Sequence, residues 1–519
     1  MEIDWKRSRR IGACPPLPGS QNKEISNMKD KLVRLAKITF LTSILAATVG
    51  LHASLSQTKV EKIDGLMKLY SEYGQFNGSV LVAEHGNEIY KRGFGLADME
   101  WDIPNEPDTK FRLGSITKQF TSMIILQLVQ EGKLKLDGKI TDYLPDYPRN
   151  TGDKVTIHHL LTHTSGIPGY TEFPNFFRDL SRDPFTPQAF VRLFADSALR
   201  FEPGAKFSYS NSGYFLLGVI IEKITGKPYE RVLKERILDP LNMKNTGYDH
   251  HETILKKRAR GYEKRGDSYV NAEYLDMSLP YSAGSLYSTV QDLMLWDQAL
   301  YTEKLLPRET RDLLFKQYIP GAGGWYGYGW VTGKAPIGNT KDSVSTIAHG
   351  GGINGFNTLI FRIPSEKDLI VLLNNTGGAP LNAISQAITG ILYDKPYDLP
   401  RQSTANVVLA TIMEHGIDAG LAQYHELREK QSGRYAVREG EMNNAGYQLL
   451  RGGKVQEAIE VFKLNVEEFP GSANVYDSLG EAYMVHGDKE LAIKNYRKSL
   501  ELNPANTNGT EMLKKLQDK

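Results

Sequence analysis

The sequence predicts one α+β domain over residues 60–395, followed by an all-α repeat domain over residues 408–519. Two observations lead to this prediction. Strand pairs stand at both ends of the first region with helices and loops between them, and a 34-residue pattern recurs in the second. Strands that enclose helices in this way favour a single sheet that joins N- and C-terminal segments. We expect residues 396–407 to be the linker.

The N-terminal segment, residues 1–56, has the pattern of a signal peptide with a short preamble. A basic stretch at 29–37 precedes 14 mostly apolar residues at 38–51, and small residues follow. A membrane span needs about 20 residues, so we expect cleavage near Ala53 or Ser56 and an exported, periplasmic or secreted protein. An uncleaved membrane anchor is the alternative.

Composition excludes several classes of protein. Met28 is an alternative start to Met1, and the 27 residues before it contain Cys14, the only cysteine. A single cysteine excludes an intramolecular disulfide and a thiolate zinc cluster. The formal net charge is +2, which gives no electrostatic reason to expect a nucleic-acid partner.

Both ends of the predicted α+β domain carry hairpin signals. A helical stretch at 61–74 precedes residues 78–95, in which two β-rich runs flank the turn tripeptide at 85–87. Residues 356–364 and 367–375 form the second strand pair, with a short polar turn between them. We therefore expect these two pairs to share one sheet.

The stretch "FRLGSITKQF" places Ser115 and Lys118 three positions apart at the start of a predicted helix over 116–128. Residues at this spacing share one helix face. Serine is also a favoured helix cap and lysine is common on helix surfaces, so the pair alone is a weak signal. The other motifs have to decide between a capped helix and a nucleophile with its base.

Two further motifs follow in the same domain. Tyr209 and Asn211 stand in "YSN", just before an apolar helix predicted over 214–224, and His349 opens the run "HGGG" before a predicted strand. A tyrosine can take the proton of a serine hydroxyl, and an asparagine amide can orient an acyl group. A backbone N–H in the glycine run can complete an oxyanion hole.

A pair of histidines gives a competing signal. His159 and His163 are four residues apart, the spacing of two zinc ligands on a helix. No glutamate follows the first of them and no third ligand is suggested. We therefore prefer a structural role for both and expect no metal.

The C-terminal region repeats itself with a period of 34 residues, which is the period of tetratricopeptide repeats. The recurring positions are Gly446, Ala458, Phe462 and Pro470 in the first unit and Gly480, Ala492, Tyr496 and Pro504 in the second. Residues 408–440 are predicted to be a degenerate third unit or a cap. We expect the repeats to bind a protein partner; the alternative is a helical buttress for the first domain.

The three motifs in this order resemble the serine β-lactamase and penicillin-binding-protein superfamily. The stretches "LLTHTSGIP" and "LDPLNMKNTGY" are similar to its branch of class C β-lactamases, D-alanyl-D-alanine carboxypeptidases and family VIII esterases. The resemblance covers about residues 65–392. It implies a β-lactamase/transpeptidase-like fold, in which helices flank an antiparallel sheet and form a further subdomain.

The resemblance implies a role for each motif residue. Ser115 is the expected nucleophile, Lys118 its partner and Tyr209 the expected general base. Asn211 would orient the substrate, and the N–H groups of Ser115 and Gly352 would form the oxyanion hole. A Lys118 ammonium would favour the Tyr209 phenolate, and either of the two groups then accepts the serine proton.

His349 departs from the class C pattern. It stands where class C β-lactamases have the lysine of Lys-Thr-Gly, and with Gly350 and Gly351 it is expected to contact substrate. A histidine is mostly neutral near pH 7, whereas a lysine attracts the carboxylate of a β-lactam. The site therefore fits the peptidase and esterase relatives better.

These observations predict an exported serine hydrolase that forms an acyl-serine intermediate on an ester, a D-amino-acid peptide or a lactam. The substrate is a small acyl or peptide compound, and the chemistry requires no cofactor. The alternative is a non-catalytic ligand sensor or scaffold that uses its repeats to bind a partner. Because all four residues of the first two motifs are present, we favour the enzyme. Contact with a membrane is expected only if the N-terminal segment stays uncleaved.

Overall fold

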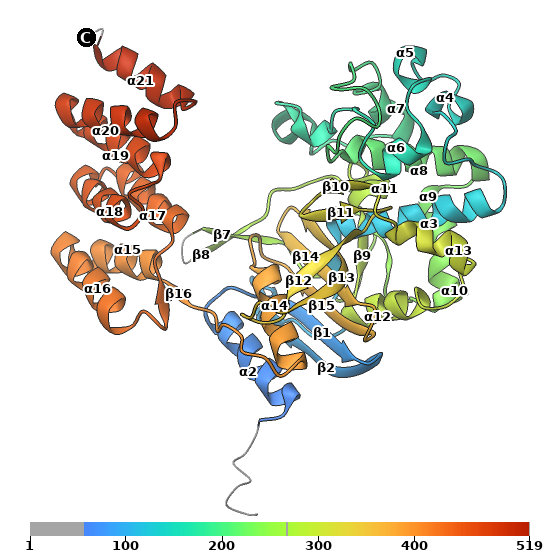
Figure 1. The fold of residues 1–519 in the computed structure, drawn as a ribbon, viewed down its shortest axis with the longest axis horizontal. Coiled ribbons are helices and arrows are strands. Elements are labelled where there is room, and N and C mark those ends of the chain that lie inside the picture. Colours follow the sequence, from blue (N-terminus) through green and yellow to red (C-terminus); the bar gives the residue numbers. More distant parts are fainter. Residues whose placement is uncertain (1–56, 266–267, 518–519) are drawn as a thin grey trace, which may run out of the picture. The chain divides into compact units, whose positions relative to one another are not determined.

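The structure, a computed structural model, describes residues 57–265 and 268–517 (Figure 1). The predicted signal peptide lies outside the described residues. In the part of the chain that is described, no helix has the length and apolar character that crossing a membrane requires. The first part of the described chain builds one large sheet with helices on both faces, and the last part is a run of helices.

All neighbouring strands of the large sheet are antiparallel, in the order β10-β11-β12-β13-β14-β15-β1-β2. Their bounds are β1 Gly78–Glu84, β2 Asn87–Phe94, β10 Ile319–Gly321, β11 Gly324–Tyr326, β12 Val331–Pro336, β13 Ser343–Ile353, β14 Phe356–Ile363 and β15 Asp368–Asn374. β1 pairs with β15, with Val80 opposite Leu372. The two predicted hairpins are therefore neighbours in one sheet, as the sequence indicates.

Alternate residues of the central strands face two different cores. The helices of these cores are α2 Lys59–Glu72 and α14 Leu381–Leu392 on one side, and α3 Thr117–Gln130, α8 Asn211–Thr225 and α12 Val290–Ala299 on the other. In β1, Val80 and Val82 pack with the first pair of helices, whereas Leu81 and Ala83 pack with the second group. Side chains of a strand alternate between faces, so a strand that is buried on both faces is apolar throughout.

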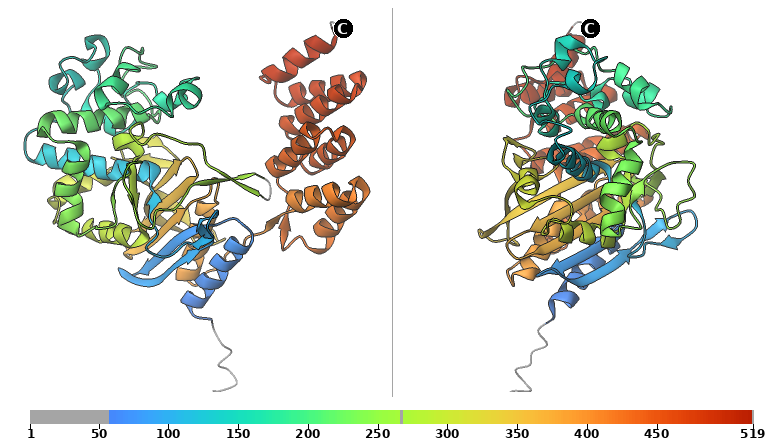
Figure 2. Two further views of the ribbon diagram at one scale, coloured as in Figure 1. Left: turned by 180° about the vertical axis from the view of Figure 1, so that it is seen from behind. Right: turned by 90° about the vertical axis from the view of Figure 1, so that its right-hand side faces the viewer.

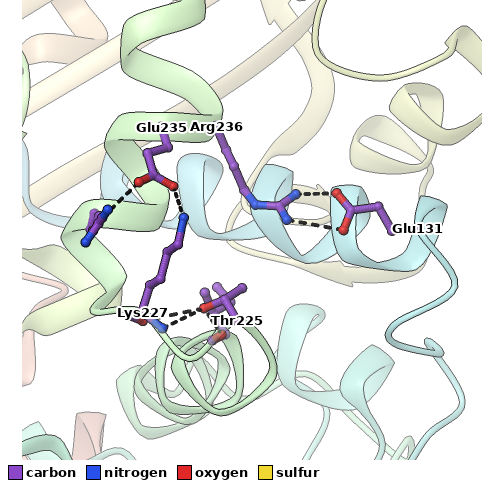
Figure 3. Close-up of polar contacts among 7 residues, drawn as sticks. Glu131, Thr225, Lys227, Glu235 and Arg236 are labelled. Atoms are coloured by element: carbon purple, nitrogen blue, oxygen red, sulfur yellow. Dashed lines mark hydrogen bonds and ion pairs between the residues drawn. The ribbon is translucent and has the colours of Figure 1, made fainter.

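The far end of α3 is tied to the segment that follows α8. α8 ends at Thr225 and is capped by Gly226, which adopts a left-handed conformation with φ +65°. Figure 3 shows Arg236, in the π-helical turn η4 (Lys234–Leu238), reaching Glu131 just beyond α3, with N–O distances of 2.5 and 3.2 Å. Lys227 pairs with Glu235 in the same region. Such partly exposed pairs are typically worth less than about 1 kcal/mol each, so they align the helix more than they stabilise it.

The C-terminal helices form pairs, as the repeat predicts. Their bounds are α15 Thr404–His415, α16 Ile417–Lys430, α17 Glu439–Arg451, α18 Val455–Glu468, α19 Ala473–His486, α20 Lys489–Leu502 and α21 Thr507–Gln517. In both repeats a glycine allows an aromatic ring to approach closely: a Cβ at Gly446 would lie 2.5 Å from Phe462, and one at Gly480 would lie 3.2 Å from Tyr496. Figure 2 shows these helices stacked in orange and red.

One boundary differs from the prediction. α15 begins at Thr404, inside the segment 396–407 that we expected to be a linker, and its side chains pack in the core of the helical region. Ser403 caps the helix by accepting a hydrogen bond from the backbone N–H of Asn406 at 3.2 Å. The C-terminal end of the expected linker is therefore a helix cap and the first turn of a helix.

Candidate active site

Ser115 lies in a tight turn at the entrance of α3. It belongs to the 3-10 turn η1 (Gly114–Ile116), its side chain is partly exposed, and neither η1 nor α3 has a side-chain cap. The turn requires φ +56° at Gly114, a conformation that residues with a side chain rarely adopt. A Cβ at Gly114 would also come within 2.9 Å of the carbonyl oxygen of Gly352. The serine is thus held against β13 and is not a helix cap.

Lys118 reaches back from the first turn of α3 to Ser115. Its Nζ lies 3.1 Å from Ser115 Oγ, 2.9 Å from Asn211 Oδ1 and 2.9 Å from the carbonyl oxygen of Ala283. The amide and carbonyl oxygens can only accept hydrogen bonds. A neutral amine would therefore donate its two hydrogens to them and direct its lone pair at the serine hydroxyl.

Burial determines the charge of Lys118. The side chain is fully buried, and this desolvation lowers its pKa well below the usual value of 10.5. Its three hydrogen-bond partners are uncharged oxygens, so none of them stabilises the ammonium form as a carboxylate would. The environment favours the neutral amine.

Tyr209 lies beside this pair with its hydroxyl buried. The hydroxyl has no partner of normal hydrogen-bond geometry, although Ser115 is near enough to affect its pKa. Burial raises the pKa of Tyr209, and the Ser115 hydroxyl opposes this to a smaller extent. Lys118 Nζ lies 4.8 Å from the ring centre. We expected an ammonium at Lys118 to favour the phenolate, but burial favours the neutral form of both groups.

Asn211 is the first residue of α8, and both ends of its amide are engaged. Oδ1 accepts from Lys118, and Nδ2 donates to Thr171 Oγ1 at 3.3 Å. Thr171 lies in the 3-10 turn η2 (Tyr170–Glu172), and Ala283 lies in the short helix α11 (Tyr281–Gly284). Sequence reasoning missed Thr171 and the Ala283 carbonyl, because nothing in their local sequence distinguishes them.

The glycine run lies on β13 beside the serine turn. Thr358 of β14 donates a hydrogen bond of 2.7 Å to the carbonyl oxygen of Leu113, two residues before Ser115, and so ties this sheet to the turn. Gly350 and Gly352 are exposed and Gly351 is buried. A Cβ at Gly352 would meet nothing within 4 Å, so this side of the strand faces open space next to Ser115.

His349 is buried and both of its ring nitrogens have partners. Nε2 lies 3.0 Å from the Tyr326 hydroxyl and Nδ1 lies 2.6 Å from the carbonyl oxygen of Gly350. Burial lowers the pKa of His349 from 6.5 to about 4. The position that carries a lysine in class C β-lactamases therefore carries no fixed positive charge in this chain.

The two histidines that suggested zinc have other partners. His163 is buried and its Nδ1 accepts a hydrogen bond of 3.0 Å from the backbone N–H of Ser210. His159 Nδ1 accepts from the backbone N–H of Thr156 at 3.2 Å. Within residues 57–265 and 268–517, no group of three or more His, Cys, Asp or Glu side chains is arranged to hold a metal ion.

Comparison with known proteins gives the same picture of the fold. The beta-lactamase family matches residues 61–390, and the tetratricopeptide repeat family matches residues 473–506. Penicillin-binding protein 4* of Bacillus subtilis (strain 168) is 32% identical over 368 residues, which are 67% of this chain and 79% of that protein.

Two solved structures are also similar. The octameric penicillin-binding protein homologue from Pyrococcus abyssi has a TM-score of 0.58 and 30% identity, over 68% of this chain and 81% of that one. The D-amino acid amidase from Ochrobactrum anthropi SV3 has a TM-score of 0.55 and 26% identity, over 64% of this chain and 97% of that one. These similarities confirm the predicted superfamily, the fold class and the C-terminal repeat, and the chain belongs to the beta-lactamase family of serine hydrolases.

Proposed function

We propose that this protein is an exported acyl-serine hydrolase that cleaves amides, peptides or esters of D-amino acids in preference to β-lactams. The observation that carries the proposal is the environment of Lys118, a fully buried amine between two acceptor oxygens and the Ser115 hydroxyl. A neutral amine in that place accepts the proton of a hydroxyl at 3.1 Å, and this activates the serine as a nucleophile.

In the first half of the reaction, Ser115 Oγ bonds to the carbonyl carbon of the substrate while its proton passes to Lys118 Nζ. The backbone N–H groups of Ser115 and Gly352 stabilise the oxyanion, and each such donor is typically worth about 3 kcal/mol. The bond to the leaving group then breaks. Tyr209 gives its hydroxyl proton to the leaving group and recovers a proton from Lys118, while Asn211 orients the acyl group.

In the second half, water replaces the leaving group and the proton transfers run in reverse. The water proton passes to Tyr209 as the Tyr209 proton passes to Lys118, and the hydroxide adds to the acyl carbon. Collapse breaks the bond to Ser115 Oγ, which takes its proton back from Lys118. The acid leaves and the enzyme returns to its starting state, with no metal or cofactor in any step.

The substrate class rests on His349 and on one relative. The neutral, hydrogen-bonded ring at this position supplies no fixed charge for the carboxylate of a β-lactam. The similarity to a D-amino acid amidase supports amide substrates with a D-amino acid as the acyl part.

The test is a comparison of kcat/KM across short acyl esters, D-amino-acid amides and peptides, and a chromogenic cephalosporin. We expect the D-amino-acid amides or the esters to be turned over at least tenfold faster than the cephalosporin, and Ser115→Ala to abolish turnover of all three. A fluorophosphonate should add once to the native protein and not to Ser115→Ala, as intact mass spectrometry would show. If the folded protein neither reacts with the probe nor hydrolyses any of these substrates, the non-catalytic alternative is correct.

Export is tested separately. The N-terminal pattern in residues 1–56 supports it, and N-terminal sequencing of the protein recovered from outside the cytoplasm should begin near Ala53 or Ser56. A mature protein that still begins at Met1 or Met28 would favour the uncleaved anchor.

A further inference from the structure

A continuous line of hydrogen bonds runs behind the reacting groups, from the loop that carries Tyr209 to the glycine strand. The backbone N–H of Ser210 donates to His163 Nδ1 at 3.0 Å, and His163 Nε2 lies 3.1 Å from the Tyr326 hydroxyl. The same hydroxyl lies 3.0 Å from His349 Nε2, and His349 Nδ1 lies 2.6 Å from the carbonyl oxygen of Gly350. All three side chains are buried.

The backbone groups at the two ends of this line, with the Tyr326 hydroxyl between the rings, determine where each proton lies. A backbone N–H can only donate, so His163 Nδ1 is unprotonated and His163 carries its proton on Nε2. A carbonyl oxygen can only accept, so His349 carries its proton on Nδ1, and its unprotonated Nε2 accepts a hydrogen bond. Tyr326 completes the line, because its oxygen accepts from His163 and its hydrogen goes to His349.

The two histidines are therefore opposite tautomers, and neither is charged. A second proton on His163 would face the N–H of Ser210, so that two donors would oppose each other. A second proton on His349 would leave the Tyr326 hydroxyl hydrogen without its acceptor. Burial lowers the pKa of both rings, which agrees with this geometry.

This line also surrounds Tyr209. The His163 ring lies against the Tyr209 ring with centroids 4.1 Å apart, and the rings of Tyr326 and His349 are each 6.5 Å away. The Tyr209 hydroxyl is buried without a partner, so it would take any free acceptor or donor nearby. Each ring nitrogen of His163 and His349 is already engaged, which leaves the Tyr209 hydroxyl to Ser115 and the reacting groups.

We propose that His163 and Tyr326 are positioning residues, which act together with the Gly350 carbonyl to fix His349 as its Nδ1–H tautomer and which keep the Tyr209 hydroxyl free for the reaction. The structural part of this inference stands without substrate. Its effect on rate rests on the proposed function.

The first experiment measures the tautomers directly. In protein labelled with ¹⁵N-histidine, long-range ¹H–¹⁵N spectra distinguish protonated from unprotonated ring nitrogens, and His163→Gln and His349→Gln assign the two signals among the 11 histidines. We expect an Nε2–H ring for His163 and an Nδ1–H ring for His349 at pH 7. The same tautomer in both rings, or a charged ring, overturns the inference whether or not the protein is active.

The second experiment removes the central hydroxyl. Tyr326→Phe leaves only the Gly350 carbonyl to favour the Nδ1–H form, so the Nε2–H tautomer of His349 should become detectable. In the same variant kcat on the best substrate should fall by about 10- to 100-fold, with KM changed less than threefold. Tyr328→Phe is the matched control, because Tyr328 is equally buried and its hydroxyl contacts His158 Nδ1 at 2.8 Å, outside this line. It should cost similar stability but leave the His349 tautomer and kcat unchanged.

Two results contradict the positioning role. One is an unchanged kcat in folded Tyr326→Phe, and the other is an equal loss of kcat in both variants. If Tyr326→Phe does not fold, His163→Asn serves instead, because its Oδ1 keeps the acceptor for Ser210 while the link to Tyr326 is lost. This variant should also make the Nε2–H form of His349 detectable and lower kcat, and no change in either the tautomer or kcat overturns the proposal. If the protein hydrolyses none of the substrates but the two tautomers are as expected, the proposed function is refuted and the inferred line of hydrogen bonds still holds.

Discussion

A Cβ on Gly351 would lie 1.9 Å from the carbonyl oxygen of Leu113, so β13 passes the approach to the Ser115 turn at a distance that only glycine permits. The neighbouring Gly352 has the opposite environment, because a Cβ there would meet nothing within 4 Å. Two adjacent glycines therefore serve different purposes. Gly351 allows the strand to pack against the turn, and Gly352 leaves open the space beside it.

Gly351→Ala should displace the Ser115 turn. The new methyl group would collide with the carbonyl oxygen of Leu113 and with the Thr358 hydroxyl, which would lie 2.4 Å away, and both belong to packed structure. We expect a loss of about 1–3 kcal/mol in the free energy of unfolding and a fall in kcat/KM of about 100-fold. Gly352→Ala is the control for stability and should unfold within about 0.5 kcal/mol of the native protein. Urea unfolding of both variants gives the comparison, and equal stabilities would contradict the close contact.

Lys118→Arg should be inactive although it keeps a basic side chain, because a guanidinium cannot become neutral in a protein. Lys118→Met should also be inactive. General base catalysis typically accelerates a reaction by about 100- to 10,000-fold. We therefore expect kcat/KM for an activated ester to fall by a factor of about 100 or more in both variants. Substantial activity in Lys118→Arg, with the fold intact by circular dichroism, would show that the proton acceptor is another group.

Tyr209→Phe keeps the ring that packs on His163 and removes the hydroxyl that the proposed mechanism uses in both half-reactions. Acylation and deacylation should each slow by about 100- to 10,000-fold when stopped-flow traces separate them. A variant that acylates slowly but clears its acyl-enzyme at the native rate would assign the activation of water to a different residue.

Stability should fall when the pH falls from 6.5 to 4. Native His349 stays neutral down to about pH 4, whereas in the unfolded chain it binds a proton near pH 6.5. Between these values the unfolded state holds more protons, so protonation favours unfolding, and above pH 6.5 the effect vanishes. A pKa difference of this size corresponds to about 3 kcal/mol at most. The ionisable groups that face the His349 ring are Lys118, His163, Tyr209 and Tyr326.

The measurement is the free energy of unfolding in urea at several pH values. His349→Gln should reduce the slope between pH 4.5 and 6 by up to about 1.4 kcal/mol per pH unit. His158→Gln is a useful companion, because burial also lowers the pKa of His158 to about 4 without a place in the candidate site. A slope that does not change in His349→Gln would mean that the native ring already binds its proton near pH 6.5.

A chain that ends at Pro400 should keep its turnover of small esters, because none of the proposed catalytic groups lies in the helices that begin at Thr404. We expect kcat/KM within about threefold of the full-length value. A shortened chain that folds but has lost activity would mean that the repeats shape the active site. That result would contradict the prediction that catalysis does not need them.

Much of the fold was predictable because its signals are local. Apolar runs on either side of the turn at 85–87 indicate a hairpin, and the 34-residue period indicates paired helices before any contact is known. The three motifs and the family follow from short stretches in a fixed order. The predicted start of the helical domain at residue 408 is later than the observed start of α15 at Thr404, because a capping residue such as Ser403 is equally common in a loop.

The partners and charges of the candidate site were not predictable, because they depend on groups that are distant in sequence. The Ala283 carbonyl meets Lys118 across 165 positions, and the Thr171 hydroxyl meets Asn211 across 40. Burial of Lys118 is a property of the packed domain, and it disfavours the positive charge that an exposed lysine would carry. The candidate residues were chosen from short motifs in the chain, whereas their protonation states come from the desolvation that folding imposes.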